Sequence, residues 1–230
     1  MEQIAALLVS AHIIGDFALQ PKFMAENKQK PVVLLLHAAI HATLAWALCL
    51  CWTCWIIPVS IFIAHGVIDL LKQRNGMKPS TSFIIDQIAH IIFLLLLAGV
   101  LSQLLSLPVL PDLYYKGVVL SAGLVAATRG SGFLVGLVTR EILDNNNLKP
   151  DGLIDGGQLI GLLERGLIFL FLLIGQPMAI GFLVTAKSIL RFEEAKQQPF
   201  AEYILIGTLL SFALAIALSA LAIRVASPGT

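Results

Sequence analysis

Residues 31–51 of the chain read PVVLLLHAAIHATLAWALCLC, and this stretch carries no Lys, Arg, Asp or Glu. An apolar run of about 20 residues matches the hydrocarbon thickness of a bilayer and predicts a transmembrane helix. The whole chain of 230 residues is also apolar, with 58% hydrophobic and 13% charged residues. Soluble domains are about 45–50% apolar and about 25% charged. We therefore expect an all-α, polytopic transmembrane helical bundle, and the composition excludes a soluble enzyme or a disordered chain.

Apolar runs separated by polar or proline-containing breaks predict about eight spans. They are residues 3–20, 31–51, 55–72, 83–106, 116–140, 153–174, 177–191 and 202–223. Residues 1–106 would form one module of four helices, and residues 107–230 a C-terminal transmembrane module of about four spans. No basic region precedes the first apolar run, so we expect a retained span there and not a cleaved signal peptide.

Basic residues predict the orientation of these spans. If the N-terminus lies outside, the inner loops hold ten Lys and Arg residues and the outer segments hold two. This bias places both termini outside a bacterial inner (cytoplasmic) membrane. Trp52 and Trp55 would then lie at the outer interface, where aromatic belts occur. The formal charge of +1 offers no basic surface for nucleic acid, so no nucleic-acid partner is expected.

The histidines are the most informative residues. All five precede residue 91, and each lies four residues from another His or from an Asp. The pairs are His12/Asp16, His37/His41, His65/Asp69 and Asp86/His90. A spacing of four places both side chains on one helix face. The pairs end the first and third spans and begin the second and fourth, so antiparallel helices would bring all four into one layer, in the cytoplasmic third of the membrane.

An internal repeat supports this arrangement. The segment 11–20 (AHIIGDFALQ) recurs 53 residues later as 64–73 (AHGVIDLLKQ), with Ala, His, Asp and Gln at matching positions. At the same offset His37 corresponds to His90, whereas His41 and Asp86 have no counterpart. The first four helices are therefore predicted to be two pseudo-repeated hairpins around a quasi-two-fold axis along the membrane normal.

Ionisable groups inside a membrane are costly and usually mark a functional site. Imidazole and carboxylate ligands suit a divalent metal, zinc first, with iron or manganese as alternatives. One or two ions are expected, and two ions sharing a hydroxide could hydrolyse an ester or a phosphoester. The predicted metal ligands are His12, Asp16, His37, His41, His65, Asp69, Asp86 and His90, and the candidate catalytic groups are Asp16, Asp69 and Asp86. The alternatives are a proton relay, a hydrogen-bonded helix staple and bis-histidine haem, which would leave the aspartates unexplained.

The second half of the chain carries charges inside its apolar runs. Arg129, Arg165 and Lys187 are predicted to bind an anionic substrate group such as a lipid phosphate. Glu164 could instead neutralise Arg165 or Lys187. The Gly-Ser-Gly sequence at 130–132 would break or kink the fifth span, and the Gly/Asp-rich segment 151–157 predicts a turn.

Three cysteines, Cys49, Cys51 and Cys54, lie close together. Their odd number argues against a disulfide framework. We expect ordinary apolar cysteines, with a soft-metal or redox role as the alternative.

The chain resembles a known family through several motifs. These are AHxxGDFxxQ at 11–20, then Lys28 and His37, then AHxxxDxxK at 64–72 and DQxxH at 86–90. Together they resemble a bacterial multi-pass inner-membrane family catalogued as a domain of unknown function, and segment 181–192 resembles that family's longer members. The His/Asp pattern is similar, more distantly, to membrane-bound metal-dependent hydrolases. The resemblance implies a membrane protein and lends no substrate.

The leading hypothesis is an integral membrane metal-dependent hydrolase acting on an amphipathic, lipid or lipid-linked substrate near the cytoplasmic face. One alternative is a metal-ion or proton-coupled transporter using the same ligands, and another is a structural subunit with a stapling metal. Beyond the histidine layer the first four spans are almost wholly apolar, which disfavours a through-path. Membrane lipids are the expected partners, and a homo-oligomer or a soluble cytoplasmic partner stays open.

Overall fold

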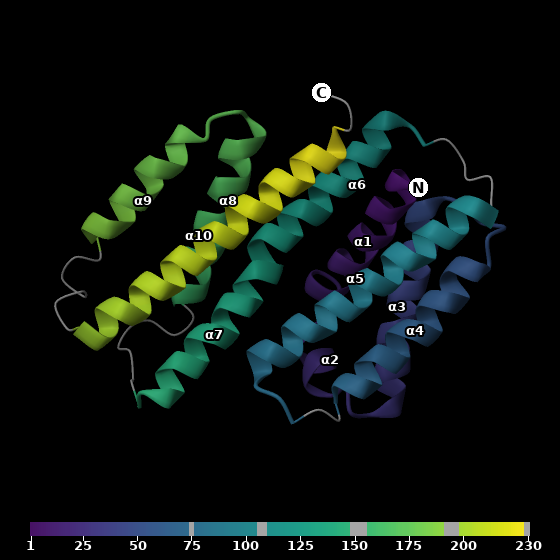
Figure 1. The fold of residues 1–230 in the computed structure, drawn as a ribbon, viewed down its shortest axis with the longest axis horizontal. Coiled ribbons are helices and arrows are strands. Elements are labelled where there is room, and N and C mark those ends of the chain that lie inside the picture. The colour runs from purple at the N-terminus through teal and green to yellow at the C-terminus, as the bar shows by residue number, and fades with distance from the viewer. Residues whose placement is uncertain (74–75, 105–109, 148–155, 191–197, 228–230) are drawn as a thin grey trace. The chain divides into compact units, whose positions relative to one another are not determined.

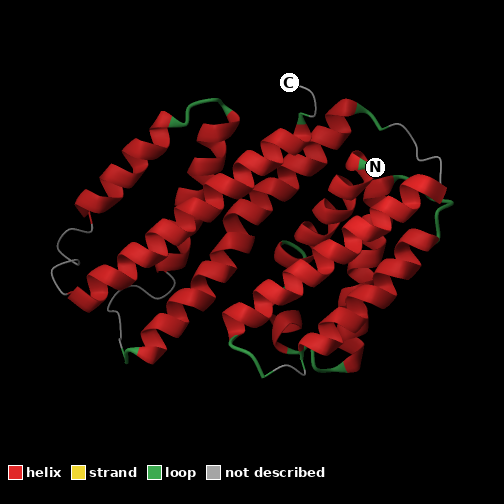
Figure 2. Cartoon of the chain, in the orientation of Figure 1, coloured by secondary structure: helices red, strands yellow, loops and turns green. Residues whose placement is uncertain are grey.

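The structure is a computed structural model that describes residues 1–73, 76–104, 110–147, 156–190 and 198–227. Every regular element in these ranges is helical, as Figures 1 and 2 show. The all-α prediction is therefore confirmed. The helices are α1 (Glu2–Phe17), α2 (Lys22–Glu26), α3 (Pro31–Cys49), α4 (Ile56–Lys72), α5 (Pro79–Leu104), α6 (Asp112–Val125), the π-helical segment η1 (Ala126–Gly130), α7 (Ser131–Asn145), α8 (Gly156–Leu173), α9 (Met178–Leu190) and α10 (Gln198–Ala226).

Five helical stretches are long and apolar enough to cross a membrane. They are Pro31–Cys49, Pro79–Leu104, Asp112–Asn145, Gly156–Leu173 and Ala201–Ala226. Helices α1 and α4 have 16 and 17 residues. At 1.5 Å per residue each rises about 25 Å, less than the roughly 30 Å of a hydrocarbon core. The chain thus has the helices of a membrane protein, but the predicted count of eight spans is not confirmed.

The chain divides into two compact units, Met1–Ala122 with Val225–Thr230, and Gly123–Arg224. In the first unit, α3 packs against α1 and α4, and α5 packs against the same two helices. The four helices therefore close into a bundle made of two hairpins, α1 with α3 and α4 with α5. Pro31 begins α3 at a position where its missing N–H costs nothing, and Leu50 ends it in the left-handed conformation at φ 50°.

The apolar core of this bundle fills the half beyond the histidines. Its fully buried side chains include Leu7, Leu8, Ile57 and Leu101. Alanines line the contacts between the helices: Ala11, Ala42, Ala45 and Ala98 are all buried in the same cluster. Small residues let membrane helices approach closely. Close packing matters inside a membrane because lipid is as apolar as the helices, so no hydrophobic effect drives the helices together.

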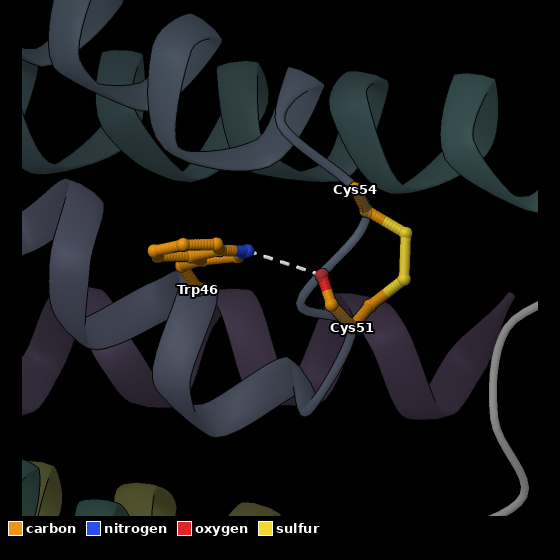
Figure 3. The surroundings of a disulfide bond; sticks show 3 residues. All are labelled: Trp46, Cys51 and Cys54. Atoms are coloured by element: carbon orange, nitrogen blue, oxygen red, sulfur yellow. Dashed lines mark hydrogen bonds between the residues drawn. A yellow bond between two sulfur atoms is a disulfide. The ribbon is translucent and has the colours of Figure 1, made fainter.

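The turn between α3 and α4 contains a disulfide bond between Cys51 and Cys54, drawn in Figure 3. The Trp46 indole N–H donates to the Cys51 carbonyl oxygen at 3.1 Å and fixes the same turn. The expectation of ordinary apolar cysteines is therefore wrong for these two, because the turn brings their Cα atoms to 5.4 Å, within bonding range. Cys49 is the cysteine that stays free, and it is buried.

In the second unit, α8 contacts η1, α7 and α9. The fifth predicted span is continuous, because Asp112–Asn145 forms one helical stretch. The Gly-Ser-Gly sequence at 130–132 does not break it. Instead η1 widens the helix just before Ser131, whose hydroxyl donates to the Ala127 carbonyl. Of the segment 151–157 predicted as a turn, residues 151–155 lie outside the described ranges and residues 156–157 begin α8.

Candidate metal centre

Helices α1, α3, α4 and α5 bring all five histidines into one cluster. The ring centroids of His41 and His65 are 3.8 Å apart, and those of His65 and His90 are 4.3 Å apart. His37 lies 4.6 Å from His41, and His12 lies 4.8 Å from His90. Every one of these side chains is buried. The i,i+4 pairs do share one layer of the bundle, as the spacing predicts.

Four residues form the first group of potential metal ligands: Asp16, His37, His41 and His65, whose ligand atoms all lie within 4.8 Å of one another. Asp16 Oδ1 is 3.2 Å from His37 Nε2 and 3.2 Å from His41 Nε2. Bonds of about 2.0–2.1 Å to a tetrahedral zinc ion would separate neighbouring ligand atoms by roughly 3.3 Å. The spacing of these atoms therefore fits a common ion.

A second group, His65, Asp69 and His90, lies beside the first and shares His65 with it. Asp69 Oδ2 is 3.6 Å from both His37 Nε2 and His65 Nε2, so it links the two groups. Three ligands with room for a further one are typical of an open, reactive metal position, whereas four protein ligands are typical of a closed one.

The strongest sign that an ion belongs here is a set of buried polar atoms without hydrogen-bond partners. At the cluster they are Asp16 Oδ1, Asp86 Oδ1, the Nδ1 atoms of His12 and His37, and the Nε2 atoms of His37, His41, His65 and His90. Asp16 Oδ1 and the four Nε2 atoms belong to residues of the two ligand groups. Buried polar side-chain atoms have a partner in the large majority of cases. Five orphaned atoms that converge on one place are explained together if they hold a cation, so the residues fit a divalent metal.

Neighbouring groups hold the candidate ligands in orientations that suit a metal ion. His90 Nδ1 lies 2.9 Å from the Asp86 carbonyl oxygen. An N–H there donates to the carbonyl and leaves Nε2 with its lone pair toward the cluster, the usual support for a metal-bound imidazole. Gln87 Nε2 donates to Asp16 Oδ2 at 2.9 Å, which leaves Asp16 Oδ1 as the oxygen that faces His37 and His41.

Two predicted ligands play a supporting part in this geometry. His12 Nε2 lies 3.3 Å from Gln87 Oε1, to which it can donate. Asp86 Oδ2 accepts from Lys72 Nζ at 2.8 Å. His12 and Asp86 therefore lie beside the two ligand groups, while the other six predicted ligands form them.

Lys28, Lys72 and Gln87 are site residues that the pairing argument missed. Lys28 Nζ donates to Asp69 Oδ2 at 3.0 Å, from a side chain 41 residues away in sequence. Such contacts between distant residues leave no trace in helical periodicity. A signal existed nonetheless, because all three stand in the motifs on which the family resemblance rests.

Gly15 makes room for His41, one of the candidate ligands. A Cβ at this position would meet the His41 ring at Cε1 and would lie 2.7 Å from both ring nitrogens. The glycine thus lets the backbone of α1 approach the imidazole, and any larger residue would displace the ring.

The cluster has an apolar side and a polar side. On the apolar side a cavity of about 10 Å³ has room for roughly one water molecule. It is lined by His12, His41, His65 and His90 with Leu8, Ala45, Ile61, Phe93 and Leu94. On the other side, Asp16 is 10% exposed, Lys28 18% and Lys72 33%. The side of the lysines is therefore the polar, partly exposed side of the cluster.

The three residues predicted to bind substrate lie in the second unit. Arg165 is buried and donates from Nε to the Thr128 carbonyl of η1 at 2.8 Å and from Nη1 to Ser211 Oγ at 3.2 Å. Lys187 Nζ pairs with Glu164 at 2.6 Å, so of the two partners considered for Glu164 it is Lys187 that forms the ion pair. Arg129 is exposed. Their role toward a substrate stays a prediction.

These features define the class: a helical protein with helices long and apolar enough to cross a membrane and a buried His/Asp cluster able to hold a metal ion. Residues 4–110 match the family described as Protein of unknown function (DUF3307). The matched part contains α1 to α5 and every residue of the cluster, and the match confirms the predicted family resemblance for these residues. The chain has no match among the curated proteins or among the solved structures.

Proposed function

We propose that the protein is an integral membrane metal-dependent hydrolase, and that its centre is built on Asp16, His37, His41, His65, Asp69 and His90. The observation that carries the proposal is the convergence of the orphaned Asp16 oxygen and four imidazole Nε2 atoms in the bundle. The distant pattern likeness to membrane-bound metal-dependent hydrolases agrees with it. Zinc suits this donor set, and iron or manganese are alternatives.

A divalent ion in this place would polarise an ester or phosphoester oxygen and activate water for attack. The chain supplies the remaining parts. Asp69 and Asp86 lie at the cluster, each held by a lysine through one carboxylate oxygen. Such a positioned carboxylate can take up the proton that an attacking water releases. Asp16 and the histidines orient the reacting groups.

The surroundings favour an amphipathic substrate. Outward-facing residues of the same helices, such as Ile63 on α4 and Ile92 on α5, are more than half exposed, and in a membrane they face lipid. The cluster lies near the ends of the helices, next to the polar side chains Lys28, Lys72 and Gln87. A substrate with its chain in lipid and its headgroup at the boundary would reach the site. By the distribution of basic residues, this boundary is the cytoplasmic face of a bacterial inner membrane and both termini lie outside.

The apolar half of the bundle argues against a transporter. Leu8, Ile57, Ile61 and Leu94 are buried beyond the histidines, and the core cluster there is made of hydrophobic side chains. A transported ion would need polar groups along this route. We therefore place the hydrolase first among the functions that the cluster could serve.

The test is a hydrolysis assay in nanodiscs. Phospholipids and lipid-linked phosphates are offered to the protein with added Zn²⁺ or with EDTA, and products are followed by mass spectrometry. Asp16→Asn should lower metal-dependent turnover by about 100-fold or more, the scale at which loss of catalytic electrostatics acts. Asp112→Asn is the matched control, because Asp112 is 74% exposed and pairs with Lys116. Equal turnover in both variants, or turnover unaffected by EDTA, would contradict the proposal.

A further inference from the structure

Lys28 and Lys72 lie on the partly exposed side of the cluster, and among the described residues they are the lysines that pair with its carboxylates. We infer that the site takes an amphiphile whose headgroup is an anionic phosphate, and that these two lysines bind the phosphate. The inference rests on the proposed metal centre and adds the class of ligand to it.

The contacts of both lysines leave donors available. Lys28 Nζ donates to Asp69 Oδ2 at 3.0 Å and to the Gln20 amide oxygen at 3.1 Å once that amide is turned to face it. Lys72 Nζ donates to Asp86 Oδ2 at 2.8 Å and lies 5.9 Å from the centre of the Phe83 ring. An ammonium group has three donors. At least one donor on each lysine can therefore point to a ligand from the exposed side.

The charge of the cluster calls for an anion once metal is present. Three aspartates, Asp16, Asp69 and Asp86, face two lysines, and neutral imidazoles add nothing. One divalent ion turns the resulting single negative charge into a single positive charge, and two ions raise it to three. Uncompensated charge at low dielectric is costly, so the loaded centre favours an anionic ligand over a neutral one.

The rim of the site is positively charged, like the metal-loaded centre. Lys30 and Lys78 are exposed on the segments that flank the two lysines. The acidic residue of α2, Glu26, has its Oε1 atom 3.8 Å from Lys22 Nζ. The charges of this pair offset each other. The turn after α2 is held to the end of α4, because Gln73 Nε2 donates to the Lys28 carbonyl at 3.1 Å. A basic rim next to a bilayer attracts anionic headgroups, and in membranes these are phosphates.

The experiment uses cobalt as a spectroscopic probe, so that it does not depend on catalysis. The full-length protein in detergent is loaded with Co²⁺, and its visible absorption is titrated with dihexanoyl phosphatidic acid, with glycerol phosphate and with dihexanoyl phosphatidylcholine. The first probe carries an anionic phosphate on a lipid, the second carries it in soluble form, and the third is zwitterionic. We expect phosphatidic acid to change the spectrum at lower concentration than phosphatidylcholine. An equal response to glycerol phosphate would show that the phosphate alone suffices, and a weaker one that the lipid chains contribute.

Variants assign the effect to the lysines. Lys28→Gln and Lys72→Gln should each weaken phosphatidic acid binding by about tenfold, the scale of one charge-assisted hydrogen bond. Lys22→Gln, on the same side of the bundle but 88% exposed, should leave it unchanged. Lys28→Arg and Lys72→Arg keep the charge and should retain most of the affinity for phosphatidic acid. These two variants still test the role of the charge if a glutamine variant fails to fold.

The outcomes separate the two proposals. If Co²⁺ binds but phosphatidic acid and phosphatidylcholine act alike, or if the glutamine variants bind phosphatidic acid as the native protein does, the phosphate assignment is overturned and the metal centre stands. If the native protein binds no Co²⁺, the metal centre fails and the phosphate assignment falls with it.

Discussion

Gly15→Ala tests the metal centre by adding a single methyl group and no polar change. The new Cβ would lie 2.7 Å from both ring nitrogens of His41. Non-bonded heavy atoms settle at about 3.5–4.0 Å, so the imidazole must move by roughly 1 Å. Metal–ligand distances tolerate about 0.2 Å. His41 would therefore leave the coordination geometry that it shares with Asp16.

The expected loss of metal affinity is at least 10–100-fold, the cost found when the support of a ligand is disturbed. Overpacking would also destabilise the bundle by about 1–3 kcal/mol. Alanine is a better helix former than glycine by about 1 kcal/mol, which offsets part of this cost. The helix α1 should persist, and the variant should report on the site.

The assay is competition for Zn²⁺ against a chromophoric chelator in detergent. Gly66→Ala is the matched control, because Gly66 adjoins His65 and its added Cβ would meet Ala38 Cβ at an ordinary 3.9 Å. Zinc affinity should fall in Gly15→Ala and stay at the native value in Gly66→Ala. Equal affinities in the two variants would refute the placement of His41 among the ligands.

Three further changes probe the rest of the structure. Gln87→Leu removes the amide that holds Asp16 Oδ2 and should lower zinc affinity about tenfold in the same chelator assay; unchanged affinity would count against this support. Lys187→Met leaves Glu164 buried without its partner and should cost about 3–5 kcal/mol, seen as a lower midpoint in thermal unfolding, whereas adding Glu164→Gln should recover much of the loss; a double variant no more stable than the single one would refute the pairing. Replacing Cys51 and Cys54 by serine removes the disulfide between α3 and α4 but should leave metal content at the native level, because this turn lies at the end of α3 away from His37; loss of metal would contradict that separation.

Much of the centre could be predicted from sequence because helices impose strict geometry. A spacing of four residues places His37 and His41 on one face, and alternating helix direction brings the ends of α1 and α4 level with the beginnings of α3 and α5. These two rules are enough to predict that the four pairs meet. The repeat at an offset of 53 residues predicts the two hairpins for the same reason.

The features that the sequence does not predict depend on contacts that do not repeat at a helical spacing. The ion pair of Lys28 with Asp69 joins a turn to a helix 41 residues later, and only three-dimensional packing selects it. The disulfide depends on the path of a short turn, which cysteine counting does not describe. The helix continues through Gly130, the last residue of η1, and Gly132 in α7, where glycine propensity alone favours a break.

The number of spans shows a different limit. The apolar run at 3–20 predicts a span, yet α1 ends at Phe17. Gln20 and Pro21 follow, and the chain turns there toward α2. Hydropathy identifies the apolar segment but does not determine the residue at which the helix ends.

The central claim is that the His/Asp cluster binds a divalent metal, and metal content tests it most directly. Native protein, purified in detergent without chelator, is compared by mass spectrometry with the His37→Ala/His90→Ala double variant, which removes one ligand from each group. We predict zinc, iron or manganese bound to the native protein and lost from the folded variant. A native protein without bound metal, or a variant with the same metal content, would contradict the account.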